Sequence, residues 1–267
     1  MQYHVIDVFT DKQFSGNPAG VCLLDKWLKD EVLQNIAAEN KLSETAFLVK
    51  NDEFYDLRWF TPALEMDLCG HATIASAFVL FEEFEKDKSI LKFKTLEGFV
   101  SVSREKDILY LDFPSWHVLP CPMYKTFEKA FGVKPIETYK ARDFLIVLDS
   151  EETVRNLKPD LYVLTAILAE AKIDNNCLGV IVTAKSSGVD FVSRVFAPWG
   201  GIDEDPVTGS THCELIPFWS KRLNKKKMIA KQLSKRGGAL YCEDCGERVK
   251  IGGKAVRYLR GEIKINV

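Results

Sequence analysis

Residues 58–77, RWFTPALEMDLCGHATIASA, predict a strand, a turn and a buried helix with a reactive group where the helix begins. Thr61-Pro62 ends the aromatic strand at 58–60, because proline has no N–H to give to a ladder and biases its predecessor away from helix. Nearly every position from 72 to 80 is small or hydrophobic, which is typical of a helix buried on all sides. The N–H groups at its start would form a site for an anion.

Cys69, Gly70 and His71 stand at the start of this helix. Glycine lets a ligand approach the backbone, and an imidazole exchanges its proton near neutral pH. Cys69 is either a nucleophile or acid/base thiol activated by the helix end, or a buried inert thiol. The spacing leaves both interpretations open.

The pattern Arg-x-Phe-x-Pro occurs twice, at 58–62 and at 194–198, about half the chain apart. A polar loop, a glycine (Gly70 or Gly209) and an apolar helix follow each copy. We interpret the repeat as a duplication that produced two similar domains, with both helix N-termini facing one interdomain cleft. Clefts between domains are common ligand sites, and paired helix ends predict a substrate that carries a carboxylate or another anion.

The composition favours a small-molecule partner. The chain has 267 residues and a formal net charge of -2, with 36 basic and 38 acidic side chains, so nothing points to nucleic acid or to a membrane surface. Seven scattered cysteines are typical of reduced thiols. The first ten residues do not resemble a signal peptide, and no apolar run reaches membrane-spanning length. We expect a soluble cytoplasmic protein.

Three polar positions outside the opening stretch are candidates for chemistry. Glu44 precedes an apolar strand, where it is either a solvated carboxylate on an edge, or a carboxylate that is desolvated or bonded by Ser43 and neighbouring N–H groups. Asp205 and Ser210 either cap the second helix or hold a substrate amine and carboxylate. The acidic run at 203–205 lacks the ligand spacing of a calcium loop, so no metal is expected.

Two further observations say little about function. Cys242 and Cys245 form a lone C-x-x-C without the second pair that zinc needs, which predicts a hairpin turn. No glycine-rich nucleotide loop occurs, so a nucleotide cofactor has no support from the sequence.

The expected elements divide at the proline-rich segment 114–122. We expect domains at 1–118 and 119–258. The sequence leaves open whether a C-terminal strand at about 259–267 returns to the first domain. Hydrophobic spacing predicts helices at 27–40, 124–131, 157–171 and 215–223. Residues 14–20 are expected to be a turn-rich segment, and the end of the chain to form strands at 255–259 and 262–267.

Ordered motifs across most of the chain resemble one known family. They are GNPAG at 16–20, NKLSETAF at 40–47, residues 58–77, DPVTGS at 205–210 and QLSKRGG at 232–238. Together they are similar to the phenazine-biosynthesis isomerases, the PhzF-like proteins with the diaminopimelate epimerase fold. The resemblance implies an α+β fold of two pseudo-symmetric domains, each a β-barrel-like sheet wrapped around a central helix, and a homodimer.

The resemblance also implies cofactor-independent isomerisation of a small carboxylate-bearing metabolite. It places Glu44 as the acid/base carboxylate, and His71 and Asp205 as groups that hold or help protonate the substrate. Gly70 and Ser210 hold substrate in this interpretation, and we add Gly209 and Asn17 as substrate-binding candidates.

One departure bears on the alternatives. Related epimerases use two opposed cysteines; Cys69 matches the first, but Pro206 stands where the second is expected. This argues against a two-thiol racemase and leaves one-base epimerisation open. The alternatives to an isomerase are therefore an amino-acid racemase or epimerase that uses Cys69, and a non-catalytic small-molecule-binding protein of the same fold.

Overall fold

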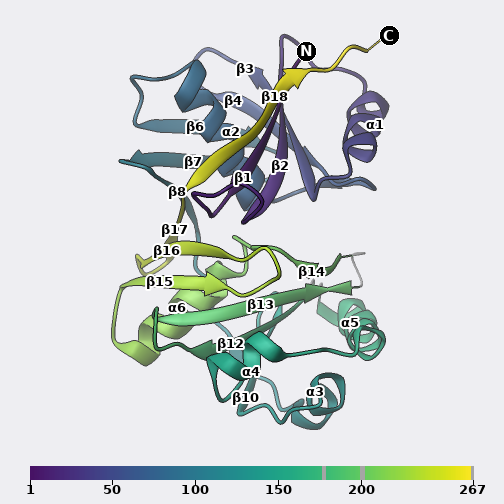
Figure 1. Ribbon diagram of the computed structural model, residues 1–267, viewed down its shortest axis with the longest axis vertical. Coiled ribbons are helices and arrows are strands. Elements are labelled where there is room, and N and C mark those ends of the chain that lie inside the picture. Colours follow the sequence, from purple (N-terminus) through teal and green to yellow (C-terminus); the bar gives the residue numbers. More distant parts are fainter. Residues whose placement is uncertain (176–178, 199–201, 266–267) are drawn as a thin grey trace. The chain divides into compact units, whose positions relative to one another are not determined.

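The computed structural model describes residues 1–175, 179–198 and 202–265, and its contacts divide the chain into two compact units (Figure 1). Unit 1 contains Met1–Phe113 and Lys250–Val267, and unit 2 contains Pro114–Val249. Helices and strands are interleaved in both units, so the fold class is α+β, as predicted.

Unit 1 is built from nine main strands and two helices among the residues described. Its elements are β1 (Gln2–Val8), β2 (Asn17–Leu24), α1 (Asp30–Asn40), β3 (Glu44–Lys50), β4 (Tyr55–Phe60), β5 (Glu65–Met66), α2 (Gly70–Glu83), β6 (Ile90–Thr95), β7 (Gly98–Glu105), β8 (Ile108–Pro114) and β18 (Ala255–Glu262). β17 (Arg248–Gly253) carries the chain back from unit 2 and pairs with β8.

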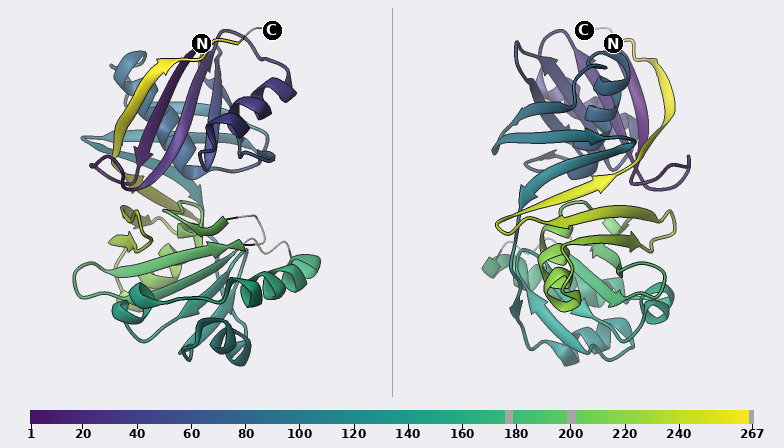
Figure 2. Two further views of the ribbon diagram at one scale, coloured as in Figure 1. Left: turned by 45° about the vertical axis from the view of Figure 1, so that its right-hand side comes forward. Right: turned by 90° about the vertical axis from the view of Figure 1, so that its left-hand side faces the viewer.

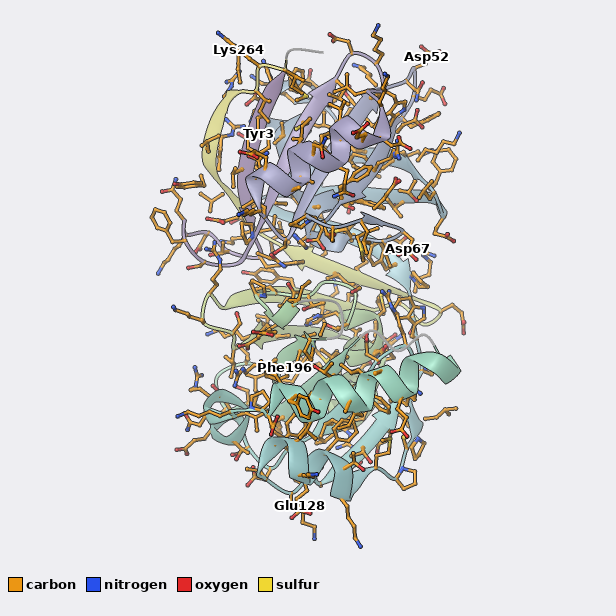
Figure 3. All side chains as sticks on the ribbon, turned by 90° about the vertical axis from the view of Figure 1, so that its right-hand side faces the viewer. Tyr3, Asp52, Asp67, Glu128, Phe196 and Lys264 are labelled. Carbon is orange, nitrogen blue, oxygen red and sulfur yellow. The ribbon has the colours of Figure 1, made fainter. Side chains whose placement is uncertain are left out.

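The strands of unit 1 pair in the order β18-β1-β2-β3-β4-β6-β7-β8. Two neighbouring pairs are parallel, β2 with β3 and β4 with β6, and a helix makes each crossover. The second crossover is α2, and Figure 2 shows the strands curving around it. α1 packs on the outer side of the sheet, where Leu33 and Ile36 cover Tyr3, which Figure 3 labels beside this helix.

α2 is the central helix that the sequence predicts. All but three of its fourteen residues are buried, because strands on several sides, among them β1, β2, β3 and β7, contact it. Such a helix has no polar face to expose, which explains its run of small and apolar residues.

Unit 2 repeats this architecture. Its elements are β9 (Leu119–Pro120), α3 (Tyr124–Phe131), β10 (Glu137–Lys140), β11 (Phe144–Val147), α4 (Glu151–Asn156), α5 (Leu161–Asn175), β12 (Val180–Lys185), β13 (Phe191–Ala197), β14 (Ile202–Asp205), α6 (His212–Leu223), β15 (Lys227–Gln232) and β16 (Gly238–Asp244). The strands pair in the order β9-β10-β11-β12-β13-β15-β16. α6 makes the crossover between the parallel strands β13 and β15, as α2 does between β4 and β6.

A separate apolar core fills the other side of the unit 2 sheet. α3, α4 and α5 pack there around Phe144 and Phe196, and Figure 3 labels Phe196 next to α5.

The repeated Arg-x-Phe-x-Pro motif makes the same contacts in both units. Arg58 on β4 forms a bidentate pair with Glu65 on β5, with nitrogen–oxygen distances of 2.7 Å. Arg194 on β13 pairs in the same way with Glu204 on β14, at 2.6 and 3.0 Å. Each guanidinium also lies over the phenylalanine two residues later, 5.1 Å from the ring centroid in unit 1 and 5.0 Å in unit 2. Shared contacts as well as shared strand order support a duplication.

Three sequence expectations about elements are wrong. The helix expected at 157–171 begins later, at Leu161 as α5, because Leu157 is extended and Asp160, after Pro159, accepts the Val163 N–H at the start of the helix. The turn expected at 14–20 is shorter, since β2 already begins at Asn17. Of the strands expected at 255–259 and 262–267, one strand forms, β18, which pairs with β1 across a register shift and ends at Glu262. Residues 263–265 are not in a strand, and residues 266 and 267 lie outside the described part.

The cysteine predictions can be compared with six of the seven residues. Among the described cysteines none forms a disulfide, as expected, and Cys177 lies outside the described residues. Cys245 lies in the hairpin turn predicted between two strands, where its N–H donates to the Arg248 carbonyl.

Candidate functional site

The beginnings of three elements of unit 1 meet at one place. β2 begins at Asn17, β3 at Glu44 and α2 at Gly70. β2 and β3 are parallel neighbours, with Ala19 opposite Glu44, and α2 packs on both strands. Parallel strands and the helix that lies on them therefore bring residues far apart in sequence to one end of the unit.

Glu44 and His71 form the centre of this cluster. His71 Nε2 lies 3.1 Å from Glu44 Oε2, and the side chains are only 7% and 11% exposed. Neither atom makes an aligned hydrogen bond in this arrangement, and catalytic hydrogen bonds often align only when substrate is present. The solvated edge carboxylate considered for Glu44 is thus wrong, because the residue is buried.

Asn17 connects the cluster to the loop before β3. Its side-chain amide is fully buried and lies 3.5 Å from His71 Nδ1. The Ser43 hydroxyl donates to Asn17 Oδ1 at 3.2 Å. Ser43 therefore orients Asn17. One of the sequence interpretations supposed that Ser43 would instead bond Glu44, and that interpretation is wrong.

Cys69 approaches the same imidazole from the helix start. It occupies the N-cap position of α2, makes no side-chain cap, and places Sγ 3.6 Å from His71 Nδ1. Its backbone carbonyl accepts the Thr73 hydroxyl at 2.5 Å, which holds the first turn in place. The imidazole thus lies between a thiol at one nitrogen and a carboxylate at the other.

The protonation states follow from burial and from these charges. Burial acts to lower the pKa of His71, but the negative forms of Cys69 and Glu44 outweigh burial and raise it well above its ordinary value. Burial, followed by the charge of Glu44, raises the pKa of the Cys69 thiol. The charge of Glu44 contributes to both shifts, which favour the protonated imidazole and the protonated thiol.

The start of α2 has the features on which the predicted anion site depends, and the site itself stays a prediction. The first N–H groups of a helix have no carbonyl acceptor within the helix and carry a partial positive charge. Gly70 and His71 are the first two residues of α2, and both are buried. A carboxylate at this end would meet these N–H groups and the imidazolium together.

The cluster also has the donor atoms of a metal site. Oxygen, sulfur and nitrogen atoms of Glu44, Cys69 and His71 lie within 4.8 Å of one another, and all three residues are buried.

Comparisons with known proteins identify the family. The family model described as phenazine biosynthesis-like protein, PhzC-PhzF, matches residues 6–261. The chain belongs to this family. It is 46% identical over 267 residues to an uncharacterized isomerase of Pseudomonas aeruginosa, covering 100% of this chain and 99% of that protein. It is 40% identical to the human phenazine biosynthesis-like domain-containing protein, with 97% of each chain covered.

Solved structures of the PhzF family have the same fold. A PhzF family protein of Enterococcus faecalis superposes with a TM-score of 0.94 at 47% identity, covering 99% of each chain. A probable proline racemase of Agrobacterium radiobacter is 8% identical, with a TM-score of 0.66, and shares the fold alone. Both the predicted family and the predicted diaminopimelate epimerase-like fold are confirmed.

The remaining predicted site residues of this PhzF-like chain lie in unit 2. Asp205 ends β14, while Gly209 and Ser210 lie in the loop before α6. Neither Asp205 nor Ser210 is the N-cap of α6, which is Thr211 without a side-chain cap. The capping interpretation is therefore wrong for both, and a role in holding substrate stays a prediction.

Two residues that position Asp205 were not among the candidates. The Thr208 hydroxyl donates to Asp205 Oδ2 at 2.5 Å. Gln232 fixes the same turn, since its amide donates to the Asp205 carbonyl at 2.8 Å and accepts the Thr208 N–H at 2.9 Å. Both residues lie in motifs that resemble the family, DPVTGS and QLSKRGG. The motifs could have marked them as candidates, but the sequence did not show what they contact.

The helices have one further property relevant to location. Within the described residues, no helix is both long enough and apolar enough to cross a membrane.

Proposed function

We propose that this PhzF-like chain is a cofactor-independent isomerase that moves a proton within a small, unsaturated, carboxylate-bearing metabolite. The contact between Glu44 and His71 at the start of α2 is the observation that carries the proposal. It combines a proton-transferring carboxylate with a positively charged group, in a buried position where a substrate carboxylate could bind.

In the proposed reaction the Glu44 carboxylate takes a proton from a substrate carbon next to a double bond. The electron pair of that C–H bond forms a new double bond, and the pair of the old one accepts a proton at the other end. The same carboxyl group returns the proton, so the reaction needs no oxidant and consumes nothing. Positioned proton transfer of this kind contributes roughly 10²–10⁴-fold to the rate.

The other polar groups of unit 1 position these two residues. The His71 imidazolium stabilises negative charge that develops on the substrate, since its pKa is raised well above its ordinary value. Asn17 and Ser43 hold the far side of the imidazole through their hydrogen bond. Asp205, Gly209 and Ser210 are proposed to hold the substrate from unit 2, on the strength of the family motif, and the active unit is proposed to be a cytoplasmic homodimer.

The test is hydrogen exchange with solvent. Unsaturated carboxylic acids are incubated with the protein in deuterated water, and deuterium incorporation is followed by mass spectrometry and NMR. Glu44→Gln should stop incorporation while calorimetry still detects binding, and Glu53→Gln, at an exposed carboxylate of the same unit, should react like wild type. Full exchange by Glu44→Gln would exclude Glu44 as the base.

A racemase or epimerase that uses Cys69 is the second candidate, favoured by the 3.6 Å approach of Sγ to His71 Nδ1. A thiol with a raised pKa suits the donation of a proton better than its removal. Cys69→Ser should abolish deuterium exchange at the α-carbon of an amino acid if this candidate is right, and leave it intact if it is wrong. Binding without exchange for every acid tested, by the wild-type protein, would instead favour the non-catalytic binding protein.

A further inference from the structure

Cys69 and His71 have the geometry of two ligands of one metal ion. With ordinary zinc–sulfur and zinc–nitrogen distances and a tetrahedral angle, the sulfur and nitrogen atoms lie about 3.5 Å apart. The observed separation of Cys69 Sγ and His71 Nδ1 is 3.6 Å. The separation is therefore that of two ligands of one cation.

The second nitrogen of His71 has the partner that a metal-bound histidine usually has. A ligating imidazole almost always donates its other ring N–H to a carboxylate, a carbonyl or water. His71 Nε2 lies 3.1 Å from Glu44 Oε2. The order thiolate, cation, imidazole and carboxylate is that of the carboxylate–histidine–zinc arrangement, with Nε2 and Oε2 in contact but not aligned as a hydrogen bond in this structure.

The surroundings exclude most of the solvent. The Asn17 amide lies 3.5 Å from Nδ1, on the nitrogen that would bind the cation, and is fully buried. The atom of Asn17 at this distance is Nδ2, which is not a metal ligand, so an oxygen of a bound carboxylate or of water would complete the coordination. Thiolate and imidazole ligands select zinc-like ions over magnesium or calcium, which prefer oxygen ligands alone.

We propose that unit 1 binds one thiophilic divalent cation, of the Zn²⁺ class, through Cys69 Sγ and His71 Nδ1, with Glu44 as the carboxylate partner of His71 Nε2. On binding, the S–H bond of Cys69 and the Nδ1–H bond of His71 break, both protons leave to solvent, and a sulfur–metal and a nitrogen–metal bond form, while His71 Nε2 keeps its proton. No oxidation is involved. The cation would bind His71 Nδ1 and hold Glu44 against Nε2, so neither group could act on substrate and the isomerase would be inhibited. That consequence alone rests on the proposed function.

Cobalt provides a direct test, because a thiolate bound to Co²⁺ gives a charge-transfer absorption in the near ultraviolet. The whole chain, freed of metal by chelator, is titrated with Co²⁺, and Zn²⁺ is then added as competitor. We expect one ion per chain and loss of the absorption on Zn²⁺ addition. Cys69→Ser should abolish the absorption, and His71→Asn should abolish it as well.

Controls separate this site from other thiols and from misfolding. Cys245→Ser removes an exposed thiol of the C-x-x-C motif and should leave the titration unchanged. Glu44→Leu should weaken binding roughly 10–100-fold, and Glu44→Gln, which keeps an acceptor, by less. Circular dichroism checks that each variant is folded.

Several results would overturn the proposal. They are absence of a stoichiometric absorption in the wild-type chain, an absorption that survives in a folded Cys69→Ser or His71→Asn variant, and an absorption that disappears in Cys245→Ser. Since the titration uses no substrate, failure of the isomerase assay would not affect it, and failure of the titration would not affect the isomerase.

Discussion

His71 Nε2 lies 3.1 Å from Glu44 Oε2, and this contact between the first residue of β3 and the second residue of α2 ties the start of the helix to the sheet. Because the pKa of His71 is raised in the folded chain, the folded state binds this proton more tightly than the unfolded state. The resulting stabilisation is complete below the unfolded pKa of about 6.5 and is lost as pH rises through the folded pKa.

The substitution His71→Gln should therefore reduce the free energy of unfolding most at low pH. The difference in free energy of unfolding between wild type and His71→Gln, measured with urea at a series of pH values, should shrink as pH rises above about 6.5. His117→Gln, at an exposed histidine, is the control and should change stability little. A difference that grows with pH would contradict the assigned direction.

His212 should show the opposite pH dependence. Burial lowers its pKa to about 4, although Nδ1 lies 2.9 Å from the Thr208 carbonyl. Between about pH 6.5 and 4 the unfolded chain binds a proton at this histidine and the folded chain does not. The free energy of unfolding therefore falls as pH drops through this range, by about 3 kcal/mol in all.

His212→Gln should remove this part of the acid sensitivity, so the variant should lose less stability than wild type between pH 7 and 4. Urea unfolding at both pH values measures it. Equal losses in the two proteins would show that His212 does not contribute.

The two arginines of the repeat should differ in how much they contribute to the free energy of unfolding. Arg194 is 9% exposed and, besides Glu204, donates to the Val154 and Leu157 carbonyls at the end of α4, at 3.1 and 2.7 Å. Arg194→Leu leaves these acceptors and a carboxylate without a partner, and should cost about 3–5 kcal/mol.

Arg58→Leu is the matched variant. The Arg58 side chain is 20% exposed and its second partner, Asp30, is 77% exposed, so its loss should cost about 1 kcal/mol. Thermal unfolding of the two variants gives the comparison, and equal costs would show that burial does not decide the contribution of the pair.

Gly16 sets the position at which β2 begins. Its φ is +65°, and a Cβ there would lie 2.0 Å from the Val8 carbonyl oxygen. Gly16→Ala should cost more than about 1 kcal/mol and displace Asn17, with a loss of ligand binding in calorimetry as well as of stability. Gly188→Ala, at a glycine whose Cβ would meet open space, is the control and should behave like wild type.

Much of the fold could be predicted because its signals are local. The small and apolar run at 72–80 requires a helix buried on all sides, and α2 is such a helix. The second Arg-x-Phe-x-Pro motif indicated a duplication, and the two units share their strand order and their bidentate arginine pairs. Prediction was wrong at the start of the helix expected at 157–171, since hydrophobic spacing continues across Pro159 whereas α5 begins only at Leu161.

The contacts of the site are not local. Asn17, Glu44 and His71 were each candidates from the sequence, but their meeting depends on the parallel pairing of β2 with β3 and on the packing of α2 across both. The sequence by itself thus determined the family, the central helix and the reactive residue types, because composition, periodicity and motif order are properties of the chain. Only the tertiary structure decided that Glu44 is buried, that Ser43 orients Asn17, and that one imidazole lies between a thiol and a carboxylate, because burial and distances between remote residues arise only when the strands pair and the helix packs on them.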